Sequence, residues 1–293
     1  MRNLFSRSAL LSSVLLIALF IISTGFSEKR SSEAPQSGII KLAYNYLADK
    51  PVKYLNVSKI TQDMDINGQS MLVNVASCLG AVVRLADKQA NNLNLEIKVD
   101  TLGQSVDSPQ GSTSSAVSEV KGKTFKMVIS PAGKTIDNSE ATKIVYNVEG
   151  SGESNLAQSF TSYFPALPEN PVKLGDTWNT HDTIDSKTPS MSMWMPVESN
   201  YKLEGIKTVD GTDCAILSAT LSGSRKMSTQ SQGMTINTAG TFTGTMTLLF
   251  AINEGYFVKE TVTTKMTGTI EIPDQNMSFP LVMTIVSTNE IVK

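Results

Sequence analysis

Histidine and cysteine are nearly absent from this chain of 293 residues, which contains one His and two Cys. A zinc site of His and Cys ligands, a haem site or an iron–sulfur cluster needs more of these residues than the chain offers. Positive charge is not in excess either, since 25 Lys and Arg stand against 27 Asp and Glu. Proteins that neutralise nucleic-acid phosphates carry a basic excess. We therefore expect no metal, no cofactor and no nucleic-acid partner.

Long hydrophobic runs are confined to the beginning of the chain. Hydrophobic residues make up 40% of the sequence and charged residues 18%. This balance excludes a polytopic membrane protein, and it excludes disorder over most of the chain.

The first 27 residues have the layout of a secretory signal peptide. Arg2 and Arg7 precede an apolar run at 10–22, and Gly25 and Ser27 supply small residues for cleavage after Ser27. The alternative is an uncleaved membrane anchor over residues 9–26, which is just long enough to span. In either case residues 28–37 form a flexible linker, and the protein is exported to the periplasm or the extracellular space.

From residue 38 onward, apolar and polar residues alternate with the period of a β-strand. Asn67-Gly68 and Asp210-Gly211 separate such runs, and both pairs are strong signals for two-residue hairpin turns. Residues 38–293 are therefore predicted to form a single, mostly β domain. Strands this long favour one curved antiparallel sheet or half-barrel over two small domains.

One segment has the period of a helix. With Ser154 as the cap, Leu156, Phe160, Tyr163 and Phe164 lie on one face. The pattern predicts a single helix at about 154–164, which covers the sheet and ends before a proline.

Recurring glycines indicate an internal repeat. Gly122 and Gly133 recur as Gly244 and Gly255 with the same internal spacing, which favours two similar halves at about 39–150 and 169–293. Chance similarity among hairpin units is the alternative. We expect Gly133 and Gly255 to have positive φ at hairpin tips.

Two motifs carry a resemblance to a known family. The segments GKTFKMVISPAGK (122–134) and FPALPENPVKLGDTW (164–178) are similar to a family of secreted, β-rich bacterial proteins of uncharacterised function. The long strands also resemble, more weakly, the curved half-barrels of periplasmic lipoprotein carriers. The resemblance implies an exported β-rich domain and brings no catalytic residues.

An unusual methionine-rich cluster is the best candidate for a ligand site. Met191, Met193, Trp194 and Met195 lie between two prolines, and soft side chains of this kind suit varied apolar ligands. The predicted site also includes Phe160 and Phe164 of the helix. Ordinary core packing or a strand edge explains the cluster equally simply.

The two cysteines, Cys78 and Cys214, would pair as a disulfide in an oxidising compartment, or remain two separate buried thiols. No catalytic constellation is recognisable: His181 has no obvious partners, and Ser118 and Lys121 match S-x-x-K without its companion motifs. The sequence predicts a non-enzymatic exported β-domain that binds a lipid or other apolar ligand in the hollow of its sheet. The alternative is a structural or protein-interaction module of the cell envelope.

Overall fold

The computed structural model of the chain describes residues 38–66, 68–148, 152–188, 190–231 and 233–292. The predicted signal peptide or anchor and the linker at 28–37 lie outside these residues, as does Asn67 of the predicted Asn67-Gly68 turn. Within the described ranges, no helix is both long and apolar enough to cross a membrane.

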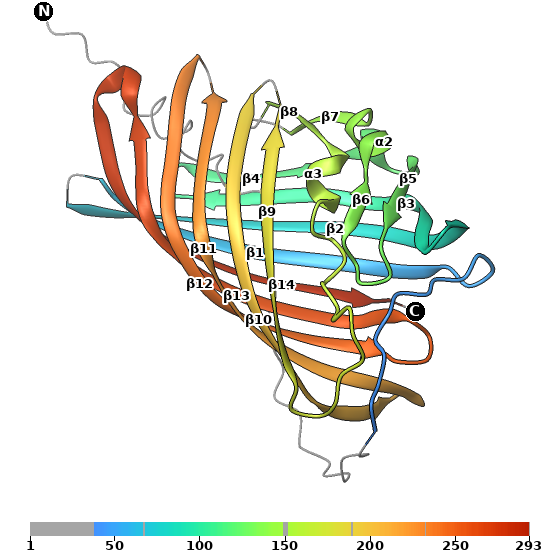
Figure 1. Cartoon of the computed structure of the whole chain (residues 1–293). Helices are drawn as coiled ribbons and strands as arrows, with labels where there is room; N and C mark the ends of the chain where they lie inside the picture. The colour runs from blue at the N-terminus through green and yellow to red at the C-terminus, as the bar shows by residue number, and fades with distance from the viewer. Residues whose placement is uncertain (1–37, 67, 149–151, 189, 232, 293) are drawn as a thin grey trace, which may run out of the picture.

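The described part of the chain is built mainly from long strands (Figure 1). The N-terminal strands are β1 (Val52–Ile66), β2 (Gln69–Gln89), β3 (Asn92–Ser108), β4 (Gly111–Ala116), β5 (Thr124–Ile129), β6 (Thr135–Asp137), β7 (Val145–Val148) and β8 (Gly152–Asn155). The C-terminal strands are β9 (Thr177–Lys187), β10 (Met191–Val209), β11 (Thr212–Ser231), β12 (Met234–Ala251), β13 (Tyr256–Ile272) and β14 (Met277–Ile291).

Twelve of these strands form one antiparallel sheet. Its order is β6-β5-β3-β2-β1-β14-β13-β12-β11-β10-β9, with β4 beside β3, and β7 and β8 pair separately. The sheet curves strongly and stays open, because β6 and β9 are its two outermost strands (Figure 1). This confirms the predicted fold class of long antiparallel strands in one curved sheet.

Strand alternation produces the two faces of the sheet. From Val262 to Ile272, β13 places every second residue on a buried or partly buried face and the others in solvent. A long strand with this pattern packs one face on a core. Most of the buried hydrophobic side chains belong to two large clusters, one rich in tyrosine and phenylalanine and one rich in methionine.

The Asp210-Gly211 turn is confirmed between β10 and β11. Asp210 has φ 49° and Gly211 has φ 82°. Two consecutive positive φ values define the turn type whose twist matches that of hairpin strands.

The helical content is smaller than the sequence predicts. The short helices are α2 (Ser139–Thr142) and α3 (Leu156–Phe160), and 3-10 turns occur at Ser118–Val120 and Pro273–Gln275. The predicted helix at 154–164 is thus too long, and Ser154 is not its cap. Residues 152–155 extend as β8, and the Asn155 side chain caps α3 by accepting a hydrogen bond from the Ala157 N–H. The apolar stripe is buried as expected, but Tyr163 and Phe164 lie beyond the end of the helix.

The two halves of the chain occupy the two sides of the sheet and meet where β1 pairs with β14. Gly133 (φ 87°) and Gly255 (φ 73°) have the positive φ that we expected. Gly122 and Gly244 differ, however, since Gly122 has φ 80° in a turn whereas Gly244 lies inside β12. The equal spacing of these glycines therefore does not correspond to equal backbone positions.

Candidate ligand-binding cavity

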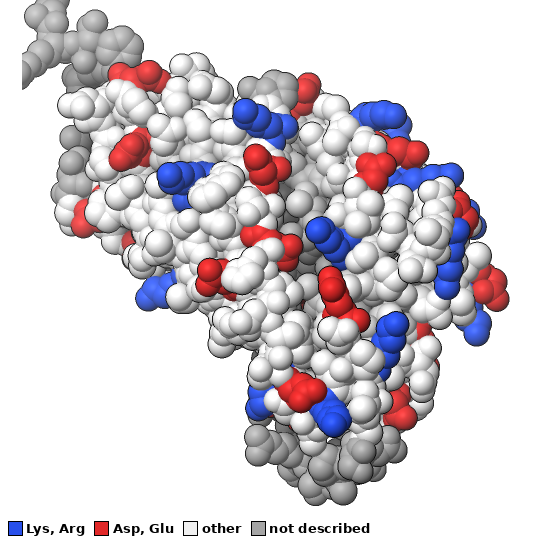
Figure 2. All heavy atoms as spheres, viewed as in Figure 1, with Lys and Arg blue, Asp and Glu red and all other residues white. Residues whose placement is uncertain are grey.

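A cavity of about 1550 Å³ lies on the concave face of the sheet. Residues of β9–β14 and of β1–β3 form its floor and one wall, and the segments 132–139 and 158–172 form the opposite wall. Figure 2 shows the hollow between β9 and the part of the molecule that contains α2 and α3. The volume exceeds the roughly 300–1,000 Å³ of pockets for drug-sized ligands.

Tyrosines and phenylalanines pack behind one part of the cavity lining, where Tyr44 contacts Phe164 and Tyr54 contacts Tyr163. The Tyr44 hydroxyl donates a hydrogen bond to the Pro165 carbonyl oxygen over 2.9 Å, and the Tyr46 and Tyr54 hydroxyls are 2.7 Å apart. Tyr54 also stacks on Phe257 with ring centroids 4.3 Å apart. Bonded hydroxyls and packed rings make this cluster, which we call the aromatic end wall, a rigid support behind the lining.

Polar side chains cross the floor next to this wall. The strand register places Glu260 of β13 opposite Asn289 of β14, and Asn289 opposite Asn56 of β1. One step further along the strands, Ser287 pairs with Ser58, and the Asn56 amide donates to the Ser287 hydroxyl over 3.4 Å. The floor therefore offers the amide groups of Asn56 and Asn289 and the carboxyl group of Glu260 in one band, with the serines buried beside them.

Apolar side chains line the rest of the floor. Ile285, Met246 and Met266 face the cavity from β14, β12 and β13, and Phe242 faces it from β12. Gly223 of β11 makes room for Phe242, since a Cβ at this position would lie 2.7 Å from the phenylalanine ring. The floor thus changes from a polar band to a longer apolar surface.

Arg225 lines the cavity within the methionine-rich part of the floor. Its guanidinium donates to the Met227 sulfur over 2.9 Å, and burial lowers the pKa of the side chain to about 10. Removal from water disfavours the charged form, which accounts for this direction.

Glu260 is the second ionisable group in the floor. Burial alone raises the pKa of its carboxyl from the ordinary 4.5 to about 8. Sequence reasoning missed this residue, although the alternation of β13 carried the signal: Val262, Thr264 and Met266 face the cavity, and the same phase includes Glu260.

The structure separates the predicted ligand-site residues into three groups. Met193, Met195 and Phe164 line the cavity. Met191 packs against the methionine-rich cluster, and Phe160 is fully buried against Phe125 with ring centroids 5.0 Å apart.

Trp194, which the sequence analysis placed in the site, is not among the residues that line this cavity. Its neighbours Met193 and Met195 point inward, and a strand turns every second side chain to the other face. The Trp194 side chain is accordingly 44% exposed.

Cys78 and Cys214 are free thiols, so the disulfide is not formed and the alternative of two separate thiols holds. Cys78 lies in β2 and Cys214 in β11, with four strands between them in the sheet. Neighbouring strands are about 4.8 Å apart, whereas a disulfide needs Cα atoms within about 7 Å.

The other residues considered from the sequence do not assemble into a site. His181 is exposed, with Nδ1 3.9 Å from a carboxylate oxygen of Glu198. Among the described residues, no group of three or more His, Cys, Asp or Glu is placed to hold a metal ion.

Residues 147–254 match the model of a family of unknown function, DUF6263. The match includes the motif at 164–178 and excludes the motif at 122–134. It confirms the resemblance to a β-rich family of uncharacterised function. No curated protein matches the chain.

Solved structures with related strand arrangements are distant. OccK2 (OpdF) of Pseudomonas aeruginosa, in complex with glucuronate, is 8% identical with a TM-score of 0.27, over 85% of this chain and 100% of that one. DynF of the dynemicin biosynthesis pathway of Micromonospora chersina is 5% identical with a TM-score of 0.23, over 92% and 94%. A DUF1329 family protein of Desulfovibrio piger is 12% identical with a TM-score of 0.16, over 83% and 87%. Likeness at this level carries no argument about function.

Proposed function

We propose that the protein is an exported, non-enzymatic domain that binds a lipid or another long apolar ligand in the hollow of its curved sheet. The observation that carries this proposal is the cavity of about 1550 Å³ on the concave face, with an apolar floor and a polar band at one end. An amphiphile has the same division between a polar head and a long apolar part. Burying hydrocarbon stabilises a complex by about 0.8 kcal/mol for each CH₂ group.

A ligand screen tests the proposal. The purified protein is mixed with phospholipids, fatty acids, fatty alcohols and alkylamines. Each mixture is examined by thermal shift and native mass spectrometry. A ligand at about 100 times its Kd is expected to stabilise the domain by about 2.7 kcal/mol and to appear as a stoichiometric adduct. Failure of every long-chain compound to shift the transition or to form an adduct contradicts the proposal.

A second candidate is an interaction module of the cell envelope, and the edge of β9 favours it. β9 is 11 residues long and pairs with β10 alone among the described strands. An unpaired edge of this length accepts a strand from another protein. The test is capture of an envelope protein by wild type and by a variant with a proline inside β9. Loss of capture in the variant supports this candidate, and unchanged capture rules it out.

A further inference from the structure

Glu260 places a carboxyl group in the lining of the cavity. In the register of the sheet, its neighbours are Leu248 of β12 and Asn289 of β14, and neither carries a charge. The adjacent cation on its own strand, Lys259, forms an ion pair of 2.8 Å with Glu290, whereas Glu260 lines the cavity. The residues next to Glu260 in the sheet therefore supply no positive charge to this carboxyl group.

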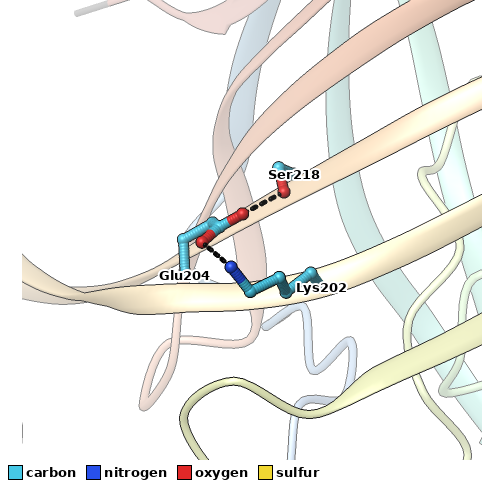
Figure 3. Close-up of polar contacts among 3 residues, drawn as sticks. All are labelled: Lys202, Glu204 and Ser218. Atoms are coloured by element: carbon cyan, nitrogen blue, oxygen red, sulfur yellow. Dashed lines mark hydrogen bonds and ion pairs between the residues drawn. The ribbon is translucent and has the colours of Figure 1, made fainter.

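Across the described residues, Glu260 has no ion pair and its carboxyl oxygens make no hydrogen bond to the protein. Glu204 on β10, a solvent-facing carboxylate of the same sheet, has hydrogen-bond partners for both of its oxygens (Figure 3). Its oxygens accept hydrogen bonds from Lys202 over 2.7 Å and from Ser218 over 2.6 Å, and these bonds lower the pKa of the group. Glu260 is partly buried in the cavity lining and has no such partner among the described residues, so its carboxyl group is open to a ligand that can satisfy it.

Tyrosines from three other segments lie within electrostatic range of Glu260, and two of them, Tyr163 and Tyr201, line the cavity with it. Burial is the main cause that raises the pKa of each hydroxyl, and the charge of ionised Glu260 raises it further, in Tyr44, Tyr163 and Tyr201. All three are neutral at physiological pH, and no Lys, Arg or His contributes to the pKa of Glu260. The tyrosines near Glu260 therefore add no charge of their own to this part of the cavity.

The charged side chains that line the cavity also favour a positively charged ligand. Two side chains of Lys and Arg line it, Lys134 and Arg225, together with the single histidine, His181. Six carboxyl groups line it, those of Asp137, Glu169, Asp176, Asp182, Asp185 and Glu260. Carboxylates on a rim raise the local concentration of cations and speed their entry.

We propose that Glu260 binds the protonated amine of a long-chain amphiphile, whose hydrocarbon part extends along the apolar floor toward the methionines of β10. This rests on the proposed function, because it assigns the head group within the same cavity. From Glu260 to Met266 the floor runs six residues along β13, a length of about 20 Å at about 3.3 Å per residue. The floor is thus long enough to take an extended alkyl chain.

Binding of the ammonium group requires ionisation of Glu260. With a pKa of about 8, most Glu260 side chains are protonated in the empty cavity at pH 7. When an ammonium ion binds, the O–H bond of the carboxyl group breaks and its proton passes to the buffer. The carboxylate then accepts hydrogen bonds from the ammonium N–H groups. Close to one proton is therefore released for each amine bound, and none is released for an uncharged ligand.

The test compares three probes with the same chain length: dodecylamine, 1-dodecanol and dodecanoate. Isothermal titration calorimetry at pH 7, in two buffers of different ionisation enthalpy, gives both affinity and proton release. We expect wild-type protein to bind dodecylamine at least about tenfold more tightly than dodecanol. Glu260→Gln is expected to lose this preference and the proton release while keeping its affinity for dodecanol.

Glu271→Gln is the matched control, because Glu271 is an exposed carboxylate on the same strand. It is expected to behave as wild type. Equal binding of dodecanol and dodecylamine, or a preference for dodecanoate, overturns the assignment of Glu260 and leaves the cavity proposal standing. Absence of binding by all three probes contradicts the proposed function itself. If Glu260→Gln does not fold, the proton release of the wild-type protein still decides the question.

Discussion

The backbone N–H of Asn45 donates a hydrogen bond to the carbonyl oxygen of Gly255 over 2.7 Å. The N–H of the preceding residue, Tyr44, donates to the carbonyl oxygen of Pro131 over 2.8 Å. The chain before β1 therefore joins two turns, that of β5–β6 at one edge of the sheet and that of β12–β13 near its middle. This connection holds the aromatic end wall of the cavity in place.

Gly255→Ala is expected to destabilise the protein by about 2–4 kcal/mol. About 1 kcal/mol comes from the positive φ, and about 1–3 kcal/mol comes from overpacking, since the new Cβ would lie 2.6 Å from Cβ of Asn45. Gly211→Ala is the control, because Gly211 has φ 82° and nothing within 4 Å of such a Cβ. Urea denaturation of both variants measures the difference. Equal losses contradict the role given to the Asn45 contact.

Tyr54→Phe is expected to cost about 1 kcal/mol of stability. The change removes a hydroxyl that lies 2.7 Å from that of Tyr46 and donates to the Phe257 carbonyl oxygen over 3.1 Å. Tyr146→Phe is the matched control, since the buried Tyr146 hydroxyl has no hydrogen-bond partner among the described residues. That substitution is expected to be neutral or stabilising in the same denaturation measurement. The reverse order of the two variants would contradict the hydrogen-bonded end wall.

Stability of the empty protein is expected to fall as the pH rises from about 5 to about 8. The pKa of Glu260 is raised from 4.5 to about 8, so between these values the folded state binds more protons than the unfolded state. The contribution of the protonated group is complete below its unfolded pKa and is lost as the pH passes its folded pKa. This pH dependence is measured from the unfolding temperatures of wild type, Glu260→Gln and Glu271→Gln over the same pH range. An unchanged slope in Glu260→Gln shows that the pKa of Glu260 is not raised.

Alkylation distinguishes the two thiols. Cys214 is buried and its pKa is raised to about 11 by burial and by nearby carboxylates, whereas Cys78 is partly exposed. The thiolate is the reactive species, so both burial and the raised pKa slow the alkylation of Cys214. We expect one rapid label with iodoacetamide in the folded protein, at Cys78, and two labels after unfolding without reductant. Two labels that appear only after reduction would demonstrate a disulfide and contradict the structure.

The alternation of apolar and polar residues predicted the strands of the sheet, because this pattern depends on residues close together in the sequence. Alternation such as that of Val262, Thr264 and Met266, and turn pairs such as Asp210-Gly211, depend on neighbouring residues only. The extent of α3 was harder to predict, because its apolar stripe continues through Tyr163 and Phe164 after the helix has ended. Tertiary packing buries these two side chains without a helical backbone.

The candidate site was only partly predictable, for a related reason. Met193 and Met195 were found by composition, but the neighbouring Trp194 follows the alternation of β10 to the other face. Glu260 has an ordinary sequence environment between Lys259 and Thr261. Its importance depends on pairing with β12 and β14, which composition does not reveal.

The most direct test of the cavity as a binding site is titration of a fluorescent single-chain amphiphile with an uncharged head group. Wild type is compared with Val197→Trp, which fills the cavity, and with Val282→Trp, which makes the same change at a side chain 39% exposed. We predict that wild type and Val282→Trp bind one probe per chain, and that Val197→Trp binds at least about tenfold more weakly. Equal affinities for the two variants, or no binding by the wild-type protein, would contradict a ligand in the hollow of the sheet.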